Sequence, residues 1–236
     1  IEVCLVGSEM CIRDRRYGNP SIRSGLEALK QRGVTDLLLL PMFPHYAQAT
    51  TESSLKHAHL QLKAMNWSPN LLEMGHFETA EEFIGPLSES IRPHLTEDTH
   101  LLFSYHGLPV SHVKRIDRSK AHCQTVEACC TVKCEANSLC YGRHCNETTM
   151  AVVERLGLKP DQWSLSYQSR LGPVKWLEPS TTQMVEALVK KGVKKLAIVA
   201  PAFLADGLET LEELDIGIRE ESVSYTHLRA HETHLN

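Results

Sequence analysis

Three apolar runs in this chain are not broken by alternating polar residues, and they restrict the folds open to it more than any other feature. Unbroken Leu, Ile and Val are typical of strands that are buried on both faces, as in parallel sheets. Helical patterns separate the runs at 21–33, 79–91 and 180–192. Alternating strands and helices predict an α/β fold in which helices flank parallel sheets. The runs themselves follow Asp36, His100 and Lys194.

Two of the helical patterns begin with residues at capping-box spacing. Thr79 and Glu82 stand three residues apart ahead of an apolar stripe, and so do Ser180 and Gln183. In a capping box each of the two side chains accepts from the backbone N–H of the other residue, which satisfies two donors at the helix start. The sequence therefore predicts side-chain caps at both places.

The composition argues against several classes of function. The net charge is −4, which does not suit a protein that binds nucleic acid by neutralising phosphates. No apolar run approaches the roughly 20 residues that span a membrane. The sequence has no glycine-rich nucleotide-binding motif, and Ser104 does not lie in the Gly-x-Ser-x-Gly motif of serine hydrolases. We therefore expect a protein of another class.

The two ends of the chain differ in character from the rest. The stretches "CLVGSEMCIRDR" and "VSYTHLRAHET" resemble translated sequencing-adapter sequence. We therefore predict that 1–15 and 222–236 are foreign to the fold. Between them we expect two α/β domains, at 16–98 and 99–221, and the first of these would begin without an opening strand.

Side chains that can do chemistry follow two of the buried runs. His106 precedes Gly107 at the end of one run, and Asp206, Glu209 and Glu213 follow another at spacings of three and four. Ligands of open parallel sheets bind beyond the carboxyl ends of the strands, and such spacings align acids on one helical face. His106 is either a hydrogen-bonded core histidine or a base near neutral pH. The acids either interact with a helix dipole or hold a cation and relay protons.

Five motifs together resemble the ferrochelatases, which insert ferrous iron into a porphyrin at the end of haem synthesis. The resemblance implies two Rossmann-like domains with a porphyrin cleft between them, and protoporphyrin IX as the substrate that becomes protohaem. Related alternatives are a coproporphyrin or cobalt chelatase, and a haem or metal carrier of the same fold without activity. The motifs, in order over about 16–221, are "RYGNP", "LPMFPHY", "SYHGLP", "YQSRLGPVKWLEP" and "PAFLADGLETLEELD".

The resemblance also implies roles for individual residues. His106 matches the active-site histidine and Glu209 its partner carboxylate, both as contacts of Fe²⁺, while Asp206 and Glu213 match acids that lead away from the site. The family's first strand and the helix after Glu221 are missing by this comparison, so we expect the chain alone to be inactive. The positions implied to lie near the porphyrin are Arg16, Tyr17, Phe43, Tyr46 and Trp176, of which Trp176 is otherwise a core residue.

Six of the eight cysteines lie in one stretch, 123–145. Cys145 matches a cysteine common in the family, but residues 110–145, the cysteine-rich segment, are longer than the usual family connection. Disulfides, free thiols and a zinc site are alternatives, although the C-x2-C pairs typical of zinc sites are absent. Some ferrochelatases carry a [2Fe–2S] cluster. The resemblance favours such a cluster on four of these five thiols: Cys123, Cys129, Cys130, Cys134 and Cys140.

The same resemblance implies where the protein works and with what. It places the protein in the cytoplasm, where disulfides are rare. Its expected partners are a porphyrin and ferrous iron, and no nucleic acid is expected. The oligomeric state and a peripheral membrane contact are left open.

Overall fold

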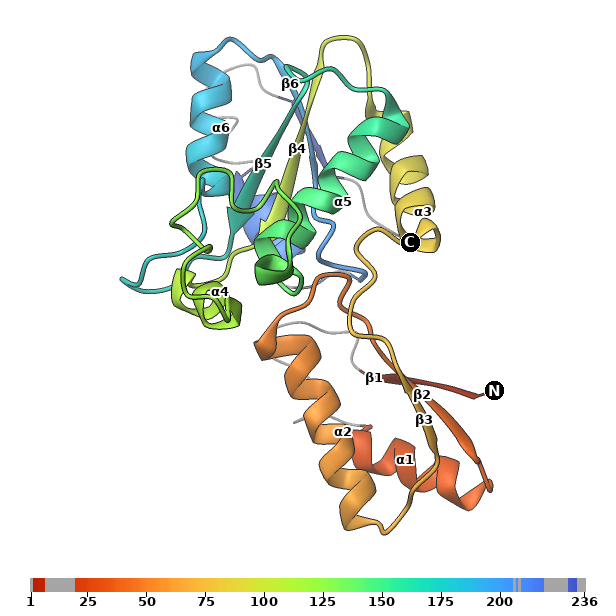
Figure 1. The fold of residues 1–236 in the computed structure, drawn as a ribbon. Coiled ribbons are helices and arrows are strands. Elements are labelled where there is room, and N and C mark those ends of the chain that lie inside the picture. Colours follow the sequence, from red (N-terminus) through yellow and green to blue (C-terminus); the bar gives the residue numbers. More distant parts are fainter. Residues whose placement is uncertain (1, 7–19, 206, 208, 219–228, 233–236) are drawn as a thin grey trace. The chain divides into compact units, whose positions relative to one another are not determined.

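The computed structural model describes residues 2–6, 20–205, 207, 209–218 and 229–232. The chain divides into two compact units, 1–77 and 78–236. Each unit has its own parallel sheet with helices beside it (Figure 1), so the predicted α/β class is confirmed.

The first unit is built on a three-stranded parallel sheet in the order β1-β2-β3. Its elements are β1 (Glu2–Val6), α1 (Ile22–Gln31), β2 (Asp36–Pro41), the π-helical turn η1 (Gln48–Glu52), α2 (Ser53–Ala64) and β3 (Asn70–Glu73). The core of the unit lies between the central strand β2 and the apolar faces of α1 and α2, which pack against that strand. The buried residues of this core are Ile22, Leu26, Leu37, Leu39, Ala58 and Leu62.

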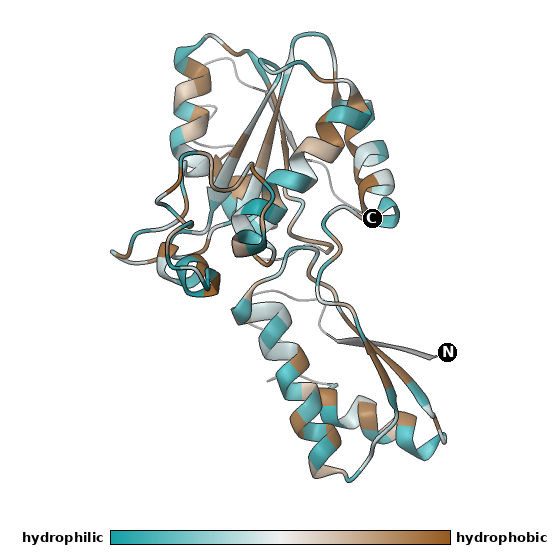
Figure 2. Ribbon diagram, viewed as in Figure 1, coloured by the Kyte–Doolittle hydropathy of each residue, from teal (hydrophilic) through white to brown (hydrophobic). Residues whose placement is uncertain are grey.

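The second unit holds a four-stranded parallel sheet in the order β5-β4-β6-β7. Its elements are α3 (Glu81–Ile91), η2 (Arg92–His94), β4 (Thr99–His106), α4 (Val110–Ile116), η3 (Glu135–Asn137), α5 (Tyr141–Leu156), β5 (Trp163–Gln168), α6 (Thr181–Lys190), β6 (Lys195–Val199), η4 (Glu209–Ile218) and β7 (Arg229–Glu232). β4 lies between β5 and β6, and seven of its eight residues are buried. Figure 2 shows hydrophobic residues along these strands. The run from His100 does not alternate because β4 is buried on both faces.

One of the two predicted capping boxes forms. The hydroxyl of Ser180 accepts from the backbone N–H of Gln183 at 3.2 Å, and the Gln183 side chain accepts from the Ser180 N–H at 3.1 Å. The box predicted at Thr79 is wrong. Helix α3 begins at Glu81 after Ala80, which makes no side-chain cap, so the helix starts one residue later than the pattern predicted.

The division between the units falls earlier than the predicted break at 98/99, because α3 belongs to the second unit. Helix α3 packs against α5, and its inner face buries Phe83, Leu87 and Ile91. The Arg155 guanidinium of α5 donates to the Glu81 carboxylate of α3 at 2.7 Å. Packing between residues as far as 74 positions apart thus overrides the polar stretch that suggested a linker.

Both segments predicted to be foreign carry a strand. β1 pairs in parallel with β2, and β7 pairs in parallel with β6. The first unit therefore has an opening strand, contrary to expectation, and both sheets are one strand wider than the apolar runs alone indicate. The origin of the two ends stays a prediction.

Among the described residues, none of the helices combines the length and the hydropathy of a membrane span.

Candidate functional site

The carboxyl ends of β4 and β5 meet at one edge of the second sheet. His106 is the last residue of β4, and its register partner is Gln168, the last residue of β5. The Gly107 N–H donates to the Gln168 carbonyl at 2.8 Å. A Cβ on Gly107 would lie 2.7 Å from that oxygen, so only glycine lets the chain turn here. The prediction that His106 stands at the end of a buried strand is confirmed.

The surroundings of His106 hold its imidazole neutral near neutral pH. The ring packs edge-to-face on Phe203, with centroids 6.1 Å apart and planes at 66°. Burial lowers the pKa of His106, and the carboxylates of Glu209 and Glu213 partly oppose this by favouring the charged form. The ring therefore has both carboxylates within electrostatic reach.

The acids lie on a π-helix rather than the α-helix that their spacing suggested. In η4 each N–H reaches back five residues, so residues four apart come close to the same face. Glu209 and Glu213 are four apart, while Thr210, Leu214 and Ile218 are buried. π-helical turns are frequent at functional sites. Asp206, the third predicted acid, lies outside the described residues.

Glu213 holds the turn that follows β5. One of its carboxylate oxygens accepts from the Ser169 backbone N–H and the other from the Ser169 hydroxyl, both at 2.7 Å. Ser169 has φ +63°, a left-handed conformation that is unfavourable for a residue other than glycine unless local bonds hold it. The role visible for Glu213 is thus to position this turn.

A buried polar network behind His106 was not singled out by the sequence. The Gln168 carboxamide accepts from the Ser104 hydroxyl at 2.5 Å and donates to the Glu209 backbone carbonyl at 3.2 Å. Thr181 lies 2.8 Å from Ser104 and 3.0 Å from Ser166, hydroxyl to hydroxyl. A signal was present in β5, where Ser164, Ser166 and Gln168 stand at every second position, because buried polar groups need partners. This network joins β4, β5 and the start of η4.

The residues predicted to lie near the porphyrin are divided between the two units. Trp176 is buried beside Gly107, and its indole N–H donates to the Leu171 carbonyl at 3.2 Å. Phe43 is buried in the first unit, where the Tyr46 hydroxyl also donates to Glu52 at 2.8 Å. Arg16 and Tyr17 lie outside the described residues.

The five thiols from Cys123 to Cys140 lie between α4 and the start of α5 in the chain, and all five are free. The Cys129 and Cys130 sulfurs are 3.8 Å apart, and Cys130 also hydrogen-bonds to Cys140. Cys123 lines a small cavity with Cys129 and Cys140. Cys134 differs, because its sulfur lies 3.7 Å from Nε2 of the His122 ring. Cys129, Cys130 and Cys140 are thus linked by successive contacts, Cys123 lines a cavity with two of them, and Cys134 faces a histidine.

The electrostatics of the thiols suit a cation. Burial, with the neighbouring thiols Cys140 and Cys129, raises the pKa of Cys123 to about 11. The hydrogen bond between Cys130 and Cys140 raises the pKa of Cys130 and lowers that of Cys140, which also accepts from backbone N–H groups of α5. Burial and neighbouring thiols thus oppose ionisation of Cys123 and Cys130 unless a positive charge lies close by. Thiolates are the ligands of zinc and of iron–sulfur clusters, so the donor set fits either group.

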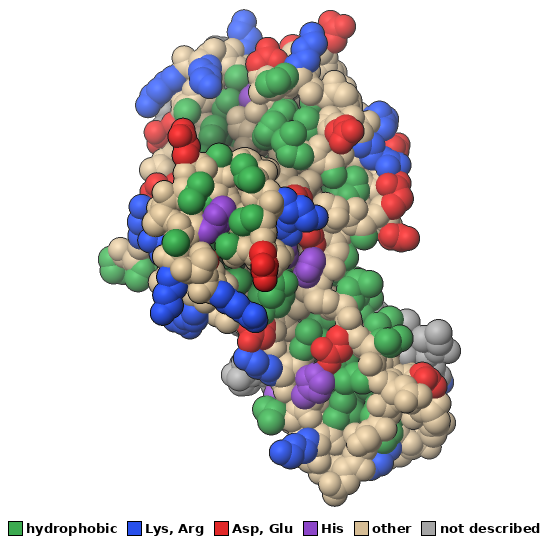
Figure 3. Space-filling model, in the orientation of Figure 1, with side chains coloured by type: hydrophobic (Ala, Val, Ile, Leu, Met, Phe, Trp, Pro, Cys, Tyr) green, Lys and Arg blue, Asp and Glu red, His purple; other side chains and the backbone are tan. Residues whose placement is uncertain are grey.

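Asp117 fixes the loop that carries Cys123. Its carboxylate accepts from the backbone N–H groups of Ser119, His122 and Cys123 at 2.8–2.9 Å, and these bonds lower the pKa of Asp117. Exposed basic side chains lie on the outer side of this region, over α4 (Figure 3). The thiols themselves are buried or half-buried. The loop thus presents its thiols inward, although it has little regular secondary structure.

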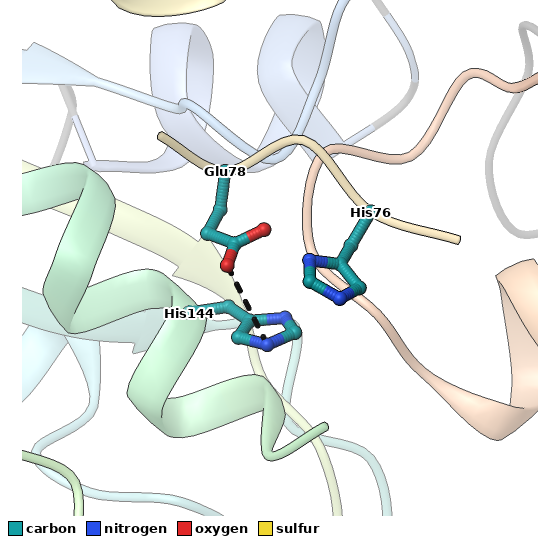
Figure 4. Close-up of side chains that lie close together, drawn as sticks. All are labelled: His76, Glu78 and His144. Carbon is teal, nitrogen blue, oxygen red and sulfur yellow. Dashed lines mark ion pairs between the residues drawn. The ribbon is translucent and has the colours of Figure 1, made fainter. Parts of the chain in front are cut away.

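A buried ion pair lies at the start of the second unit. Figure 4 shows the Glu78 carboxylate facing the His144 ring, with Oε1 and Nε2 3.6 Å apart. The His144 ring nitrogen also lies 2.9 Å from the Ser138 carbonyl. The pair ties the segment before α3 to α5 and to the cysteine-rich segment. His76, which the figure also labels, belongs to the first unit.

The fold places the chain in a class of two-unit α/β proteins with parallel sheets. Among solved structures it is similar to SirB from Bacillus subtilis with Fe³⁺, with a TM-score of 0.58 over 93% of this chain and 71% of that one, at 14% identity. A family model described as Ferrochelatase matches residues 13–231. The chain belongs to the ferrochelatase family.

Relatives in curated collections carry the same family name. The chain is 41% identical over 207 residues to the ferrochelatase of Bdellovibrio bacteriovorus, which covers 87% of this chain and 61% of that protein. It is 38% identical over 210 residues to the ferrochelatase of Pseudomonas aeruginosa strain LESB58, with 89% and 62% covered. The chain thus spans about three fifths of the length of these relatives.

Proposed function

We propose that the protein inserts Fe²⁺ into protoporphyrin IX to form protohaem, at the sheet edge that carries His106. The observation that carries this proposal is the position of His106 at that edge, where its ring packs on Phe203 and the carboxylates of Glu209 and Glu213 act on its pKa. Membership of the ferrochelatase family supports it. A haem or metal carrier without activity does not need a proton acceptor beside a carboxylate, so this arrangement favours an enzyme over a carrier.

The residue types suit the chemistry of metal insertion. A porphyrin loses two pyrrole protons as it gains one Fe²⁺, so the site needs proton acceptors. Neutral His106 accepts one proton, as a general base does, and the Glu209 carboxylate accepts the other or contacts the arriving iron. Imidazole and carboxylate bind Fe²⁺ moderately, which suits a metal that must be released to the substrate. Binding energy from the rest of the macrocycle distorts the ring and exposes its nitrogens.

The remaining residues have supporting roles in this proposal. By the family resemblance, Asp206 is proposed to help lead iron or protons to and from Glu209. Glu213 adds negative charge to that row while it holds Ser169 in place. The porphyrin is contacted by Arg16, Tyr17, Phe43, Tyr46 and Trp176.

We expect the full-length protein to insert Fe²⁺ into protoporphyrin IX under anaerobic conditions. The measurement is the loss of porphyrin fluorescence against a sample without protein. Tight porphyrin binding without metal insertion would instead support the carrier. Faster reaction with coproporphyrin, or with Co²⁺, would move the assignment to a related chelatase.

We also propose that the cysteine-rich segment holds a [2Fe–2S] cluster on Cys123, Cys129, Cys130 and Cys140. The set is supported by the contact between the Cys129 and Cys130 sulfurs, by the hydrogen bond of Cys130 to Cys140, and by the cavity that Cys123 lines with Cys129 and Cys140. Cys134 instead contacts His122, so we leave that thiol outside the set. When bound, the cluster supplies a rigid cross-link of the segment, since metal insertion needs no redox step. Free thiols are kept reduced in the cytoplasm, where we place the protein.

The proposed ligand set predicts which cysteine substitutions remove iron. Cys140→Ala is expected to lose most of the bound iron and acid-labile sulfide, because a cluster needs four ligands. Cys134→Ala, and the matched control Cys145→Ala on buried α5, should retain both. Iron and sulfide per chain, measured after anaerobic purification, test this. Equal loss in Cys134→Ala and Cys140→Ala would contradict the set, and zinc without sulfide would replace the cluster by a zinc site.

A further inference from the structure

The first turn of α5 connects the thiols to the histidine of the site. Tyr141 is the first residue of this helix, and it is buried. Its hydroxyl donates to the backbone carbonyl of His106 at 2.8 Å. The next peptide N–H, that of Gly107, is held by Gln168. Tyr141 therefore fixes one side of the peptide plane that follows His106, and with it the direction of the imidazole.

The same turn is in contact with the sulfurs. Cys140 is the residue before Tyr141, and its sulfur accepts from the backbone N–H groups of Gly142 and Arg143. A Cβ on Gly142 would lie 3.0 Å from the Cys130 sulfur. The backbone on both sides of Tyr141 is thus packed against Cys130 and Cys140. A change in the position of these sulfurs displaces the turn, because a packed interior transmits strain.

We propose that Tyr141 is a positioning residue that couples the state of the Cys130–Cys140 pair to the orientation of His106. The proposal rests on the proposed function for its effect on metal insertion, but the structural link stands on the contacts alone. Coupling of this kind is reciprocal, so the orientation of His106 also affects the thiols. The cysteine-rich segment then has a regulatory connection to the site without taking part in the chemistry.

Tyr105 offers a matched control. It is also a buried tyrosine, and it precedes His106 on β4. Its hydroxyl lies 2.8 Å from that of Thr149, eight residues after Tyr141 on α5. Tyr105→Phe therefore removes an equivalent buried hydroxyl without cutting the proposed link.

The test compares Tyr141→Phe, Cys130→Ala and the double variant in the full-length protein. Tyr141→Phe is expected to lower kcat for metal insertion by about 5- to 10-fold, which is a usual size for coupling between sites, with porphyrin affinity unchanged. Cys130→Ala should lower kcat as well, and the double variant should be no slower than the slower single variant. Tyr105→Phe should keep the parent kcat. Effects that multiply in the double variant, or a Tyr141→Phe protein as fast as Tyr105→Phe, would overturn the proposal.

A second readout does not depend on activity. The ¹⁵N NMR signals of the His106 ring should shift in Cys130→Ala, and this shift should be absent when Tyr141→Phe is also present. If the parent protein fails to insert iron but the signals behave in this way, the proposed function fails and the coupling stands. Unchanged His106 signals in Cys130→Ala would refute the coupling whatever the activity.

Gly142→Ala tests the coupling independently, in case Tyr141→Phe does not fold. The added Cβ pushes the Cys130 sulfur away while the Tyr141 hydroxyl remains. The His106 ring signals are expected to shift in this variant too. Signals identical to those of the parent would count against the proposal.

Discussion

His106→Ala is expected to abolish metal insertion while porphyrin binding remains. A positioned general base contributes about 10²- to 10⁴-fold to a rate, and here the base is a neutral ring at a strand end with two acids in electrostatic reach. Alanine removes the proton acceptor but leaves β4 and the Gly107 turn intact. The measurements are the anaerobic rate of Fe²⁺ insertion and the quenching of protein fluorescence by protoporphyrin IX.

An exposed histidine of the same unit serves as the control. His112 lies on α4, six residues further along the chain, and its side chain faces solvent. His112→Ala should insert iron at the parent rate. If His106→Ala also kept the parent rate, the site would have to be sought elsewhere. If it lost porphyrin binding together with activity, His106 would be a binding residue and not a base.

Glu209→Gln is expected to cause the second largest loss of the metal-insertion rate. Glu213→Gln is expected to affect mainly stability. Glutamine cannot accept a proton or attract Fe²⁺ as a carboxylate does, so Glu209→Gln should lower the rate by about 10²-fold or more. Glu213→Gln loses one acceptor of the two bonds to Ser169, and a hydrogen bond to a charged group contributes about 1.5–3 kcal/mol. We therefore expect Glu213→Gln mainly to lower the free energy of unfolding, with a smaller loss of rate.

Ser169→Ala separates the two roles of Glu213. It removes the hydroxyl bond at 2.7 Å and leaves the carboxylate charged. If Glu213 acts by holding the turn, Ser169→Ala should reproduce part of its loss of stability, and the two substitutions together should be less than additive. Thermal unfolding and insertion rates of the three proteins measure this. A Glu213→Gln protein with the parent stability and the low rate of Glu209→Gln would make Glu213 a relay instead.

Much of the fold could be predicted because burial is recorded in local patterns. The run from His100 does not alternate because β4 lies between two strands with helices on both faces. The cap at Ser180 depends on residues three apart, so it was predictable as well. The missed features depend on more distant packing. Helix α3 joined the second unit through α5, and η4 formed a π-helix where acid spacing alone indicated an α-helix.

The candidate site divides in the same way. His106 and Glu209 follow buried runs, and parallel strands bring their carboxyl ends to one edge, so sequence order and strand direction suffice to predict their approach. Which thiols lie together could not be predicted, because an irregular loop has no sequence periodicity that indicates which way each side chain points. Asp117 fixes the part of this loop that carries Cys123, through three backbone N–H groups.

By itself the sequence determined the α/β class, the histidine and acids at the strand ends, and the concentration of thiols in one segment. Only the tertiary structure decided that Glu213 holds Ser169, 44 residues away, and that Tyr141 holds His106, 35 residues away. The physical reason is that propensity and periodicity act over a few residues. Contacts across tens of residues are instead set by the order of strands in the sheet and by the helix packed beside them.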